Sequence, residues 1–227
     1  DGTPISALPA AFRDFAQLER LEVDQFAGVE AQIAALADDI AYNNHDIDDG
    51  IAAGLFTIDD MLHLPLVGDV FRSVRIEHPV LDTQRTVYEA VRRLIGLWIG
   101  DLIEETERRV AQYQPQSATE VRALPEPLVA FSEDFDRQQR ALRAFLFERM
   151  YKHYKVNRMR SQAKRVLKEL FELFLAEPDI LPPPLRQDAE QAPEARRARL
   201  VCDYIAGMTD NYAIDLHRKL FTLEGMV

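Results

Sequence analysis

Residues 37–50, with the sequence ADDIAYNNHDIDDG, lie within the segment that decides the fold. Between about Asp24 and Ala53, apolar residues recur at the spacing of an α-helix and cluster on one side of a helical wheel. These residues are Ile33, Leu36, Ile40, Ile47 and Ile51. The segment is therefore predicted to form one long helix with an apolar face.

The opposite face of this predicted helix is acidic. Asp38, Tyr42 and Asp46 follow one another at intervals of four residues, so their side chains project from one face in successive turns. Like charges at this spacing repel one another, and no Lys or Arg occurs from Leu21 to Phe71 to relieve the repulsion. A bound cation with carboxylate ligands would supply the missing positive charge. The alternative is an acidic face that is simply exposed to solvent, although a purely solvated face gives no reason for Tyr42 in its middle.

Helical spacing dominates the rest of the chain, and strand-like alternation is nearly absent. Thr57 and Asp60 form a capping-box pattern, which predicts a short helix that ends before Pro65. Periodic apolar residues predict four further helices, over residues 83–113, 156–174, 201–208 and 210–221. The predicted fold class is all-α, a multi-helix bundle.

The composition is that of a soluble globular protein. The chain has 227 residues, of which 47% are hydrophobic and 29% charged, and its net charge is −11. The negative charge argues against a protein whose whole surface binds nucleic acid. No apolar run reaches the ~20 residues needed to cross a bilayer, and the single cysteine, Cys202, fits a reducing compartment. We expect a cytoplasmic protein with no membrane segment.

The charge reverses between Glu148 and Lys168, where eight Lys or Arg stand against one acid. Such asymmetry suggests one cation-attracting and one anion-attracting region, or two solvated helix faces of opposite sign. Known nucleotide and metal motifs do not decide between these alternatives. The run from Asp46 to Gly50 fails as a calcium loop because its glycine falls at position 5 instead of position 6. No P-loop, G-x-G-x-x-G or H-E-x-x-H motif occurs.

Residues 37–56 resemble the signature of bacterial dGTPases and their homologues in the HD-domain phosphohydrolase superfamily. Two further stretches match in order: residues 145–153, FLFERMYKH, and residues 204–213, YIAGMTDNYA. The resemblance covers most of the chain and implies the C-terminal part of an HD-domain-type bundle. Residues 1–64 would then be the end of the catalytic domain, and residues 65–227 a helical C-terminal region packed on it.

The resemblance also implies roles for individual residues. In that family a divalent metal, Mg or Mn, is held by a His, a His-Asp pair and one distant Asp, and Asp38 takes the place of the distant ligand. Tyr42 and Asp46 would lie against the deoxyribose, with Asp46 near the 3′-hydroxyl and Tyr42 crowding the 2′ position.

Arg149 and Lys152, which flank Tyr151 in the second matching stretch, are candidates for phosphate contacts, because guanidinium and ammonium groups form charge-assisted bonds to phosphate oxygens. An exposed helix face or a contact between subunits is the alternative for both cations.

The implied reaction is hydrolysis of a dNTP to a deoxynucleoside and triphosphate. The family's other metal ligands and its proposed catalytic His belong to an earlier part of its sequence, so no residue here is assigned a catalytic role. We expect this chain alone to bind the catalytic metal poorly and to turn over no substrate. The resemblance further implies a homo-oligomer and a nucleotide or single-stranded DNA effector.

Two rival functions stay open at this point. One is a regulatory helical module without catalysis, which binds nucleotide or nucleic acid through the basic region 149–168. The other is a helical scaffold whose motif has lost its activity.

Overall fold

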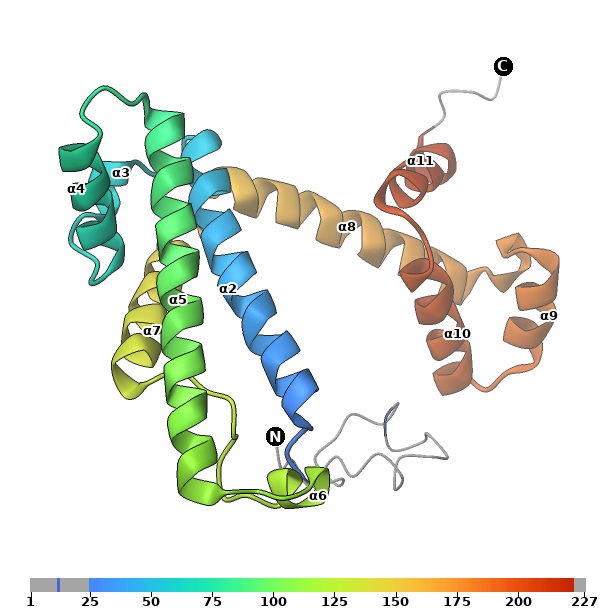
Figure 1. Cartoon of the computed structure of the whole chain (residues 1–227). Coiled ribbons are helices and arrows are strands. Elements are labelled where there is room, and N and C mark those ends of the chain that lie inside the picture. The colour runs from blue at the N-terminus through green and yellow to red at the C-terminus, as the bar shows by residue number, and fades with distance from the viewer. Residues whose placement is uncertain (1–11, 13–24, 223–227) are drawn as a thin grey trace. The chain divides into compact units, whose positions relative to one another are not determined.

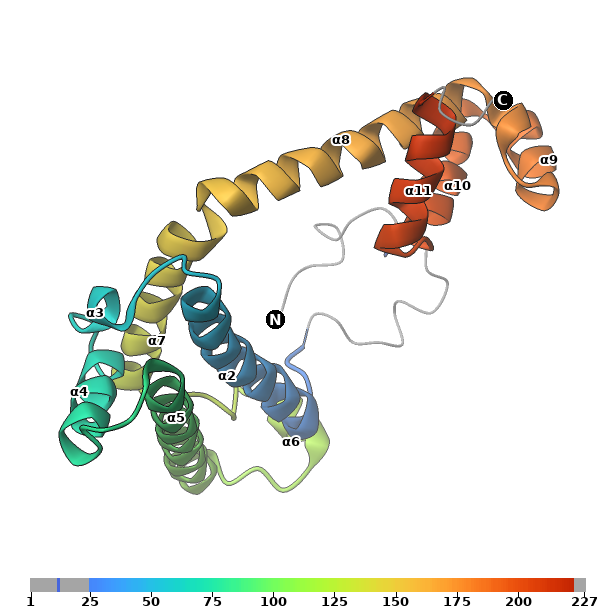
Figure 2. The same ribbon diagram turned by 90° about the horizontal axis from the view of Figure 1, so that it is seen from above.

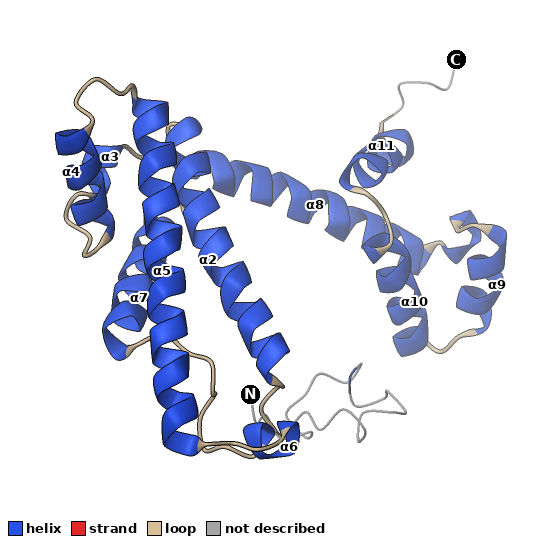
Figure 3. Cartoon of the chain, viewed as in Figure 1, coloured by secondary structure: helices blue, strands red, loops and turns tan. Residues whose placement is uncertain are grey.

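The computed structural model of the chain describes Phe12 and residues 25–222, and within them every regular element is a helix (Figures 1 and 3). The prediction of an all-α fold is confirmed. The chain divides into two units, the first ending at Lys152 and the second beginning at His153. The division at residue 64 that the resemblance implies stays a prediction. No helix within the described ranges is long and apolar enough to cross a membrane.

The helices of the first unit are α2 (Val29–Ala52), α3 (Ile58–Met61), α4 (Val67–Glu77), α5 (Thr83–Tyr113), α6 (Ala118–Arg122), α7 (Glu133–Leu146) and the π-helical turn η3 (Phe147–Tyr151). Those of the second are α8 (Tyr154–Ala176), the 3-10 turn η4 (Pro178–Ile180), α9 (Pro183–Gln191), α10 (Glu194–Ala206) and α11 (Asp210–Phe221). All the helices predicted from periodicity are present. The first helix begins at Val29 and not near Asp24 as predicted, because residues 25–28 are not helical; Asp24 itself lies outside the described residues.

The core of the first unit forms where α2 and α4 pack against α5 and where α7 packs against α2 (Figures 1 and 2). Trp98 of α5 lies at its centre, with the rings of Phe131 and Phe135 meeting it edge-on at centroid distances of 5.7 and 5.3 Å. Ile47 of α2 and Leu142 of α7 are fully buried in the same core. Each such side chain contributes about 1.5–3 kcal/mol through removal of apolar surface from water.

The turn after α2 depends on two glycines. Gly54 has a φ of +63°, a left-handed conformation that favours glycine at a helix C-terminus. A Cβ at Gly50 would lie 2.2 Å from the ring of Phe56, so the missing side chain lets this ring fold back against α2. Phe56 then meets Phe145 of α7 edge-on, at a centroid distance of 5.2 Å. The turn thus links the end of α2 to the end of α7.

The short helix α3 begins with the predicted capping box. The Thr57 amide donates to Asp60 Oδ2 at 2.8 Å, and the Asp60 amide donates to Thr57 Oγ1 at 3.3 Å. Two donors at the helix start are thereby satisfied by a local sequence pattern alone.

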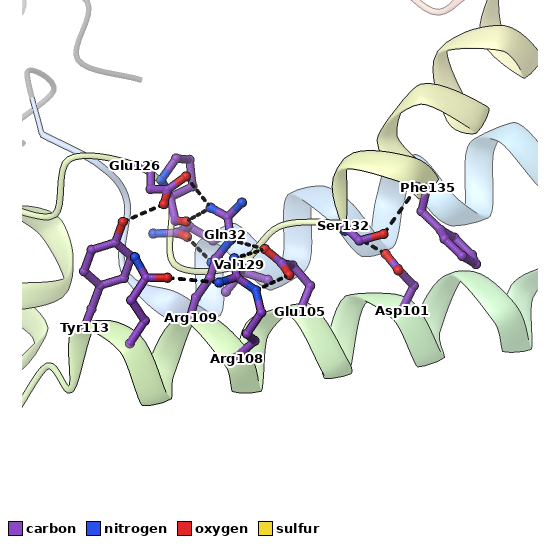
Figure 4. A network of polar contacts seen from close by, with 12 residues as sticks. Gln32, Asp101, Glu105, Arg108, Arg109, Tyr113, Glu126, Val129, Ser132 and Phe135 are labelled. Carbon is purple, nitrogen blue, oxygen red and sulfur yellow. Dashed lines mark hydrogen bonds and ion pairs between the residues drawn. The ribbon is translucent and has the colours of Figure 1, made fainter.

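Polar contacts fix the loop between α6 and α7 along α5 (Figure 4). Arg109 donates to Glu105 at 2.7 Å, to Glu126 at 3.0 Å and to the carbonyl of Pro127 at 2.7 Å. Gln32 joins the start of α2 to the same loop, because its Oε1 accepts from the Val129 amide at 2.9 Å. These bonds hold the loop that precedes α7, and α7 leads directly into η3.

The second unit has its own smaller core. The C-terminal half of α8 packs against α10 and α11, and the buried side chains include Leu170, Phe174, Val201 and Ala213. The cations of the N-terminal part of α8 are instead exposed to solvent. The packed face of α8 thus lies in the C-terminal half of the helix.

Candidate functional site

A cleft of about 270 Å³ lies between the middle of α2 and the segment formed by the end of α7 and η3. Its two sides differ in character, with acidic and amide groups from α2 facing aromatic, apolar and cationic groups from α7 and η3. The lining residues are Asp39, Tyr42, Asn43, Asp46, Arg143, Leu146, Phe147 and Tyr151.

A hydrogen bond between the two sides forms part of the cleft. Tyr151 Oη donates to Asp46 Oδ2 at 2.6 Å, and Asp46 is only 7% exposed. Burial raises the pKa of Asp46, and the bond from Tyr151 opposes this effect only in part. Burial also raises the pKa of Tyr151, followed by its hydrogen bonds to Asp46 and Tyr42. Tyr151 therefore keeps its proton at neutral pH and acts as a donor to the carboxylate.

The π-helical turn η3 carries Tyr151. The Lys152 amide donates to the carbonyl of Phe147 at 3.0 Å, a bond between residues five apart that is wider than an α-helical turn. Such single turns occur mostly inside or beside α-helices and are frequent at functional sites. Here the turn ends α7 and brings a tyrosine to the acidic face of α2.

Among the described residues that line the cleft, Arg143 is the one cation. Its guanidinium pairs with Asp39 at 2.7 Å, and both side chains are nearly half exposed. Exposed pairs of this kind contribute about 0–1 kcal/mol, so exchanging Asp39 for another anion costs little. Arg143 can therefore meet a negatively charged group at the mouth of the cleft.

Comparison with known proteins connects this site to a family. Residues 129–219 match the phosphohydrolase-associated domain. The chain is 52% identical over 223 residues to a deoxyguanosinetriphosphate triphosphohydrolase-like protein of Parvibaculum lavamentivorans, covering 98% of the chain and 56% of that relative. It is 55% identical over 204 residues to the protein of the same description from Caulobacter vibrioides, covering 90% of the chain and 52% of that relative.

Over nearly its whole length the chain is similar to dGTPase-like proteins. It spans about half the length of these curated relatives. The family resemblance inferred from residues 37–56, 145–153 and 204–213 is thereby confirmed.

The three residues of α2 to which the family resemblance assigns roles differ in their surroundings. Asp38 is exposed to solvent and is not among the residues that line the cleft. Tyr42 lines the cleft with 58% of its surface exposed, and Asp46 is buried one turn further along. The acidic face is therefore solvated at Asp38 but covered by protein at Asp46. A fully solvated face, the alternative considered from the sequence, does not describe this helix.

The two cations proposed from the matched motif as phosphate contacts form ion pairs with carboxylates that do not line the cleft. Arg149 pairs with Asp60 at 2.6 Å and lies over the ring of Phe145, whereas Lys152 pairs with Glu148. Neither residue lines the cleft.

Sequence reasoning missed three residues of the site: Asn43, Arg143 and Tyr151. Tyr151 stands inside the matched stretch 145–153 and could have been found there. Arg143 precedes this stretch and carries no comparable signal.

The described residues do not by themselves form a metal centre. Among them, no group of three or more His, Cys, Asp or Glu side chains is arranged to hold an ion. His45, the histidine nearest to Asp38 in sequence, lines a separate apolar groove of about 520 Å³ between α2 and α5. A metal held through Asp38 would need ligands from outside the described ranges.

Proposed function

We propose that this chain forms the deoxyribose-binding part of a metal-dependent dNTP triphosphohydrolase. Such an enzyme hydrolyses a dNTP to a deoxynucleoside and inorganic triphosphate. The observation that carries the proposal is the pairing of buried Asp46 with Tyr151 in a cleft whose mouth holds Tyr42. The relatives are described as triphosphohydrolase-like proteins, which supports the same reaction.

Asp46 is suited to bind a sugar hydroxyl. An ionised carboxylate offers about four acceptor positions on its two oxygens, and Tyr151 occupies one of them. A ligand hydroxyl that donates to the remaining positions would compensate the carboxylate for its loss of water. The 3′-hydroxyl of a deoxynucleotide fits this requirement.

Tyr42 is suited to select the sugar. Its ring lines the same cleft one turn before Asp46, so a sugar held by Asp46 would lie against it. A 2′-hydroxyl would then meet the ring instead of water. Steric exclusion of a single hydroxyl discriminates on the order of 10²-fold.

Arg143 is the best-placed phosphate ligand among the described residues, because it is the cation that lines the cleft. A guanidinium binds phosphate oxygens through two parallel hydrogen bonds. Arg149 and Lys152 remain proposed contacts for the outer phosphates, and each would first have to leave its present carboxylate partner.

Asp38 is proposed as one anionic ligand of a divalent metal, Mg or Mn, which would polarise the phosphoryl oxygen and lower the pKa of the attacking water. The remaining ligands would come from a segment that corresponds to the part of the relatives that this chain does not match. We therefore propose that the chain alone is inactive. From the family resemblance we further propose that the complete enzyme is a cytoplasmic homo-oligomer.

A chimera tests this function. The chain replaces the matching part of the Parvibaculum lavamentivorans relative, and the products formed from dGTP with Mn²⁺ are identified. We expect deoxyguanosine and triphosphate from the chimera, no turnover by the chain alone, and at least a 100-fold loss of rate with Asp46→Ala. Release of orthophosphate or pyrophosphate instead would contradict the proposal.

A second candidate function is a regulatory module that binds a nucleotide or single-stranded DNA. The observation that favours it is a row of exposed cations along α8: Lys155, Arg158, Arg160, Lys164, Arg165 and Lys168. Binding through this row would weaken steeply as salt is raised, because phosphate contacts release counterions. Affinity for single-stranded DNA that is independent of salt, or that is lost with Asp38→Ala, would argue against this role.

A further inference from the structure

Asn43 is a buried amide whose donor is unpaired among the residues that the structure describes. The residue is 7% exposed, and its Nδ2 makes no hydrogen bond within the described part of the chain. The next residue, Asn44, is also buried, but its Nδ2 donates to the carbonyl of Ile40 at 2.7 Å. A buried donor without a partner destabilises a fold, so such groups are rare and call for an explanation.

The position of Asn43 supplies that explanation. Its side chain lines the cleft together with Tyr42, Asp46 and Tyr151. Asn43 and Asp46 are three residues apart on α2, which makes them neighbours on the helix surface. The residue with the unpaired donor and the residue with the buried acceptor therefore both line one small cavity.

We propose that Asn43 Nδ2 donates a hydrogen bond to the same ligand hydroxyl that donates to Asp46. The chemistry of the two groups restricts what can bind. An amide nitrogen only donates, and an ionised carboxylate only accepts. A hydroxyl does both at once, whereas an ammonium cannot accept from Asn43 and a carboxylate cannot donate to Asp46. The pair thus selects a hydroxyl-bearing ligand.

This inference rests on the proposed function, under which the hydroxyl is the 3′-hydroxyl of a deoxynucleotide. It adds a specificity-determining residue beyond Asp46 and Tyr42. It also accounts for the cost of Asn43 to the unliganded fold, because binding the hydroxyl would satisfy the unpaired donor.

The test compares two ligands that differ only in the 3′-hydroxyl. Dissociation constants of dGTP and 2′,3′-dideoxyguanosine triphosphate are measured by calorimetry for the full chain, for Asn43→Leu and for a control. The control is Gln139→Met, since Gln139 also has a buried side-chain nitrogen without a partner but lies on α7 outside the cleft. Both substitutions replace an amide by an apolar group of similar size.

We expect the wild-type chain to bind dGTP more tightly than the dideoxy ligand. Asn43→Leu should lower this ratio roughly tenfold, the effect of losing one hydrogen bond, while Gln139→Met leaves it unchanged. The melting temperature of Asn43→Leu should stay level or rise, because removing an unpaired buried polar group is neutral or stabilising.

The outcomes separate the inference from the function on which it rests. If the wild-type chain binds neither ligand, or binds both equally, the proposed sugar site itself fails. If the wild type discriminates and Asn43→Leu discriminates equally well, only the role of Asn43 is overturned. A marked fall in melting temperature with equal weakening of both ligands would show that Asn43 is structural and would also overturn it.

Discussion

Tyr151 donates a hydrogen bond of 2.6 Å to Asp46 across 105 residues of sequence. The bond joins the end of η3 to the acidic face of α2 and places a proton donor against a buried carboxylate. Each group shifts the pKa of the other, so the ionisation of Asp46 and that of Tyr151 are linked across the cleft. Removing either group should therefore affect both stability and the protonation of its partner.

Tyr151→Phe removes the hydroxyl and keeps the ring. The buried Asp46 carboxylate then loses a donor, and we expect the free energy of unfolding to fall by about 1.5–3 kcal/mol, as for other hydrogen bonds to charged groups. Urea denaturation at pH 7 measures the change. Tyr154→Phe is the matched control because Tyr154 is exposed, and it should leave the midpoint unchanged. Equal midpoints for the two variants would contradict a stabilising Tyr151–Asp46 bond.

Asp46 should also give stability an unusual pH dependence. Its pKa in the folded protein lies above the value of 3.8 expected when unfolded, so the folded state holds the proton more tightly. The contribution of Asp46 is thus most favourable below pH 3.8 and is lost as the pH rises through the raised pKa. Relative to Asp46→Asn, the wild type should become less stable between pH 4 and pH 8. A difference that does not change with pH would show that burial does not perturb this carboxyl group.

Glu105 should act in the opposite direction. Hydrogen bonds from Arg108, opposed by burial and aided by Arg109, lower its pKa to about 2. Its contribution is therefore present above pH 4.5 and lost as the pH falls toward 2.

The bonds of Arg109 can be tested directly, since Arg109→Lys cannot reach Glu105, Glu126 and the Pro127 carbonyl together.

For Arg109→Lys we expect a loss of about 1–3 kcal/mol in the free energy of unfolding, because partly buried acceptors lose their donors. Arg137→Lys is the control, as Arg137 and its partner Asp134 are both mostly exposed, and its denaturation midpoint should hardly move. If the two variants unfold at the same urea concentration, the loop between α6 and α7 does not depend on Arg109.

Gly50→Ala should destabilise the protein although alanine is the better helix former. The added Cβ would lie 2.2 Å from the Phe56 ring, and the resulting displacement should cost about 1–3 kcal/mol. At Gly96 in α5 an added Cβ meets nothing within 4 Å, so Gly96→Ala should stabilise by about 0.5–1 kcal/mol. Thermal melting of both variants checks the opposite signs. A stabilising Gly50→Ala would mean that Phe56 moves away at no cost.

The sequence predicts those elements whose signals are local. The helix α5 was expected over Thr83–Tyr113 and has these bounds, because its apolar residues recur regularly over many turns. The helix α3 was found from two residues of a capping box. The helix α7 was not predicted, since its few buried apolar residues stand among many charged ones. Its burial is set by where the preceding loop places it, which no local pattern encodes.

The features of the site also fall into those that local sequence predicts and those that depend on packing between distant segments. The spacing of Tyr42 and Asp46 predicts that they share a helix face, and in the structure both residues line one cleft. The burial of Asp46 and its bond to Tyr151 depend on packing between distant segments, so the sequence spacing could not reveal them. The choice of Arg149 and Lys152 rests on their position in a matched motif, and position in a motif does not specify which side chain faces a cavity.

The choice of phosphate ligand gives the last prediction. If Arg143 binds phosphate, Arg143→Gln should weaken dGTP binding by about 10–100-fold, since charge-assisted bonds contribute about 1.5–3 kcal/mol. Binding of deoxyguanosine, which has no phosphate, should not change. Arg140→Gln is the matched control, because it removes the same charge from α7 at a residue that pairs with Asp136 outside the cleft. A larger effect of Arg149→Gln on dGTP would reassign the phosphates to the motif cations. Equal weakening of dGTP and deoxyguanosine by Arg143→Gln would instead show that Arg143 supports the cleft through Asp39 without touching phosphate.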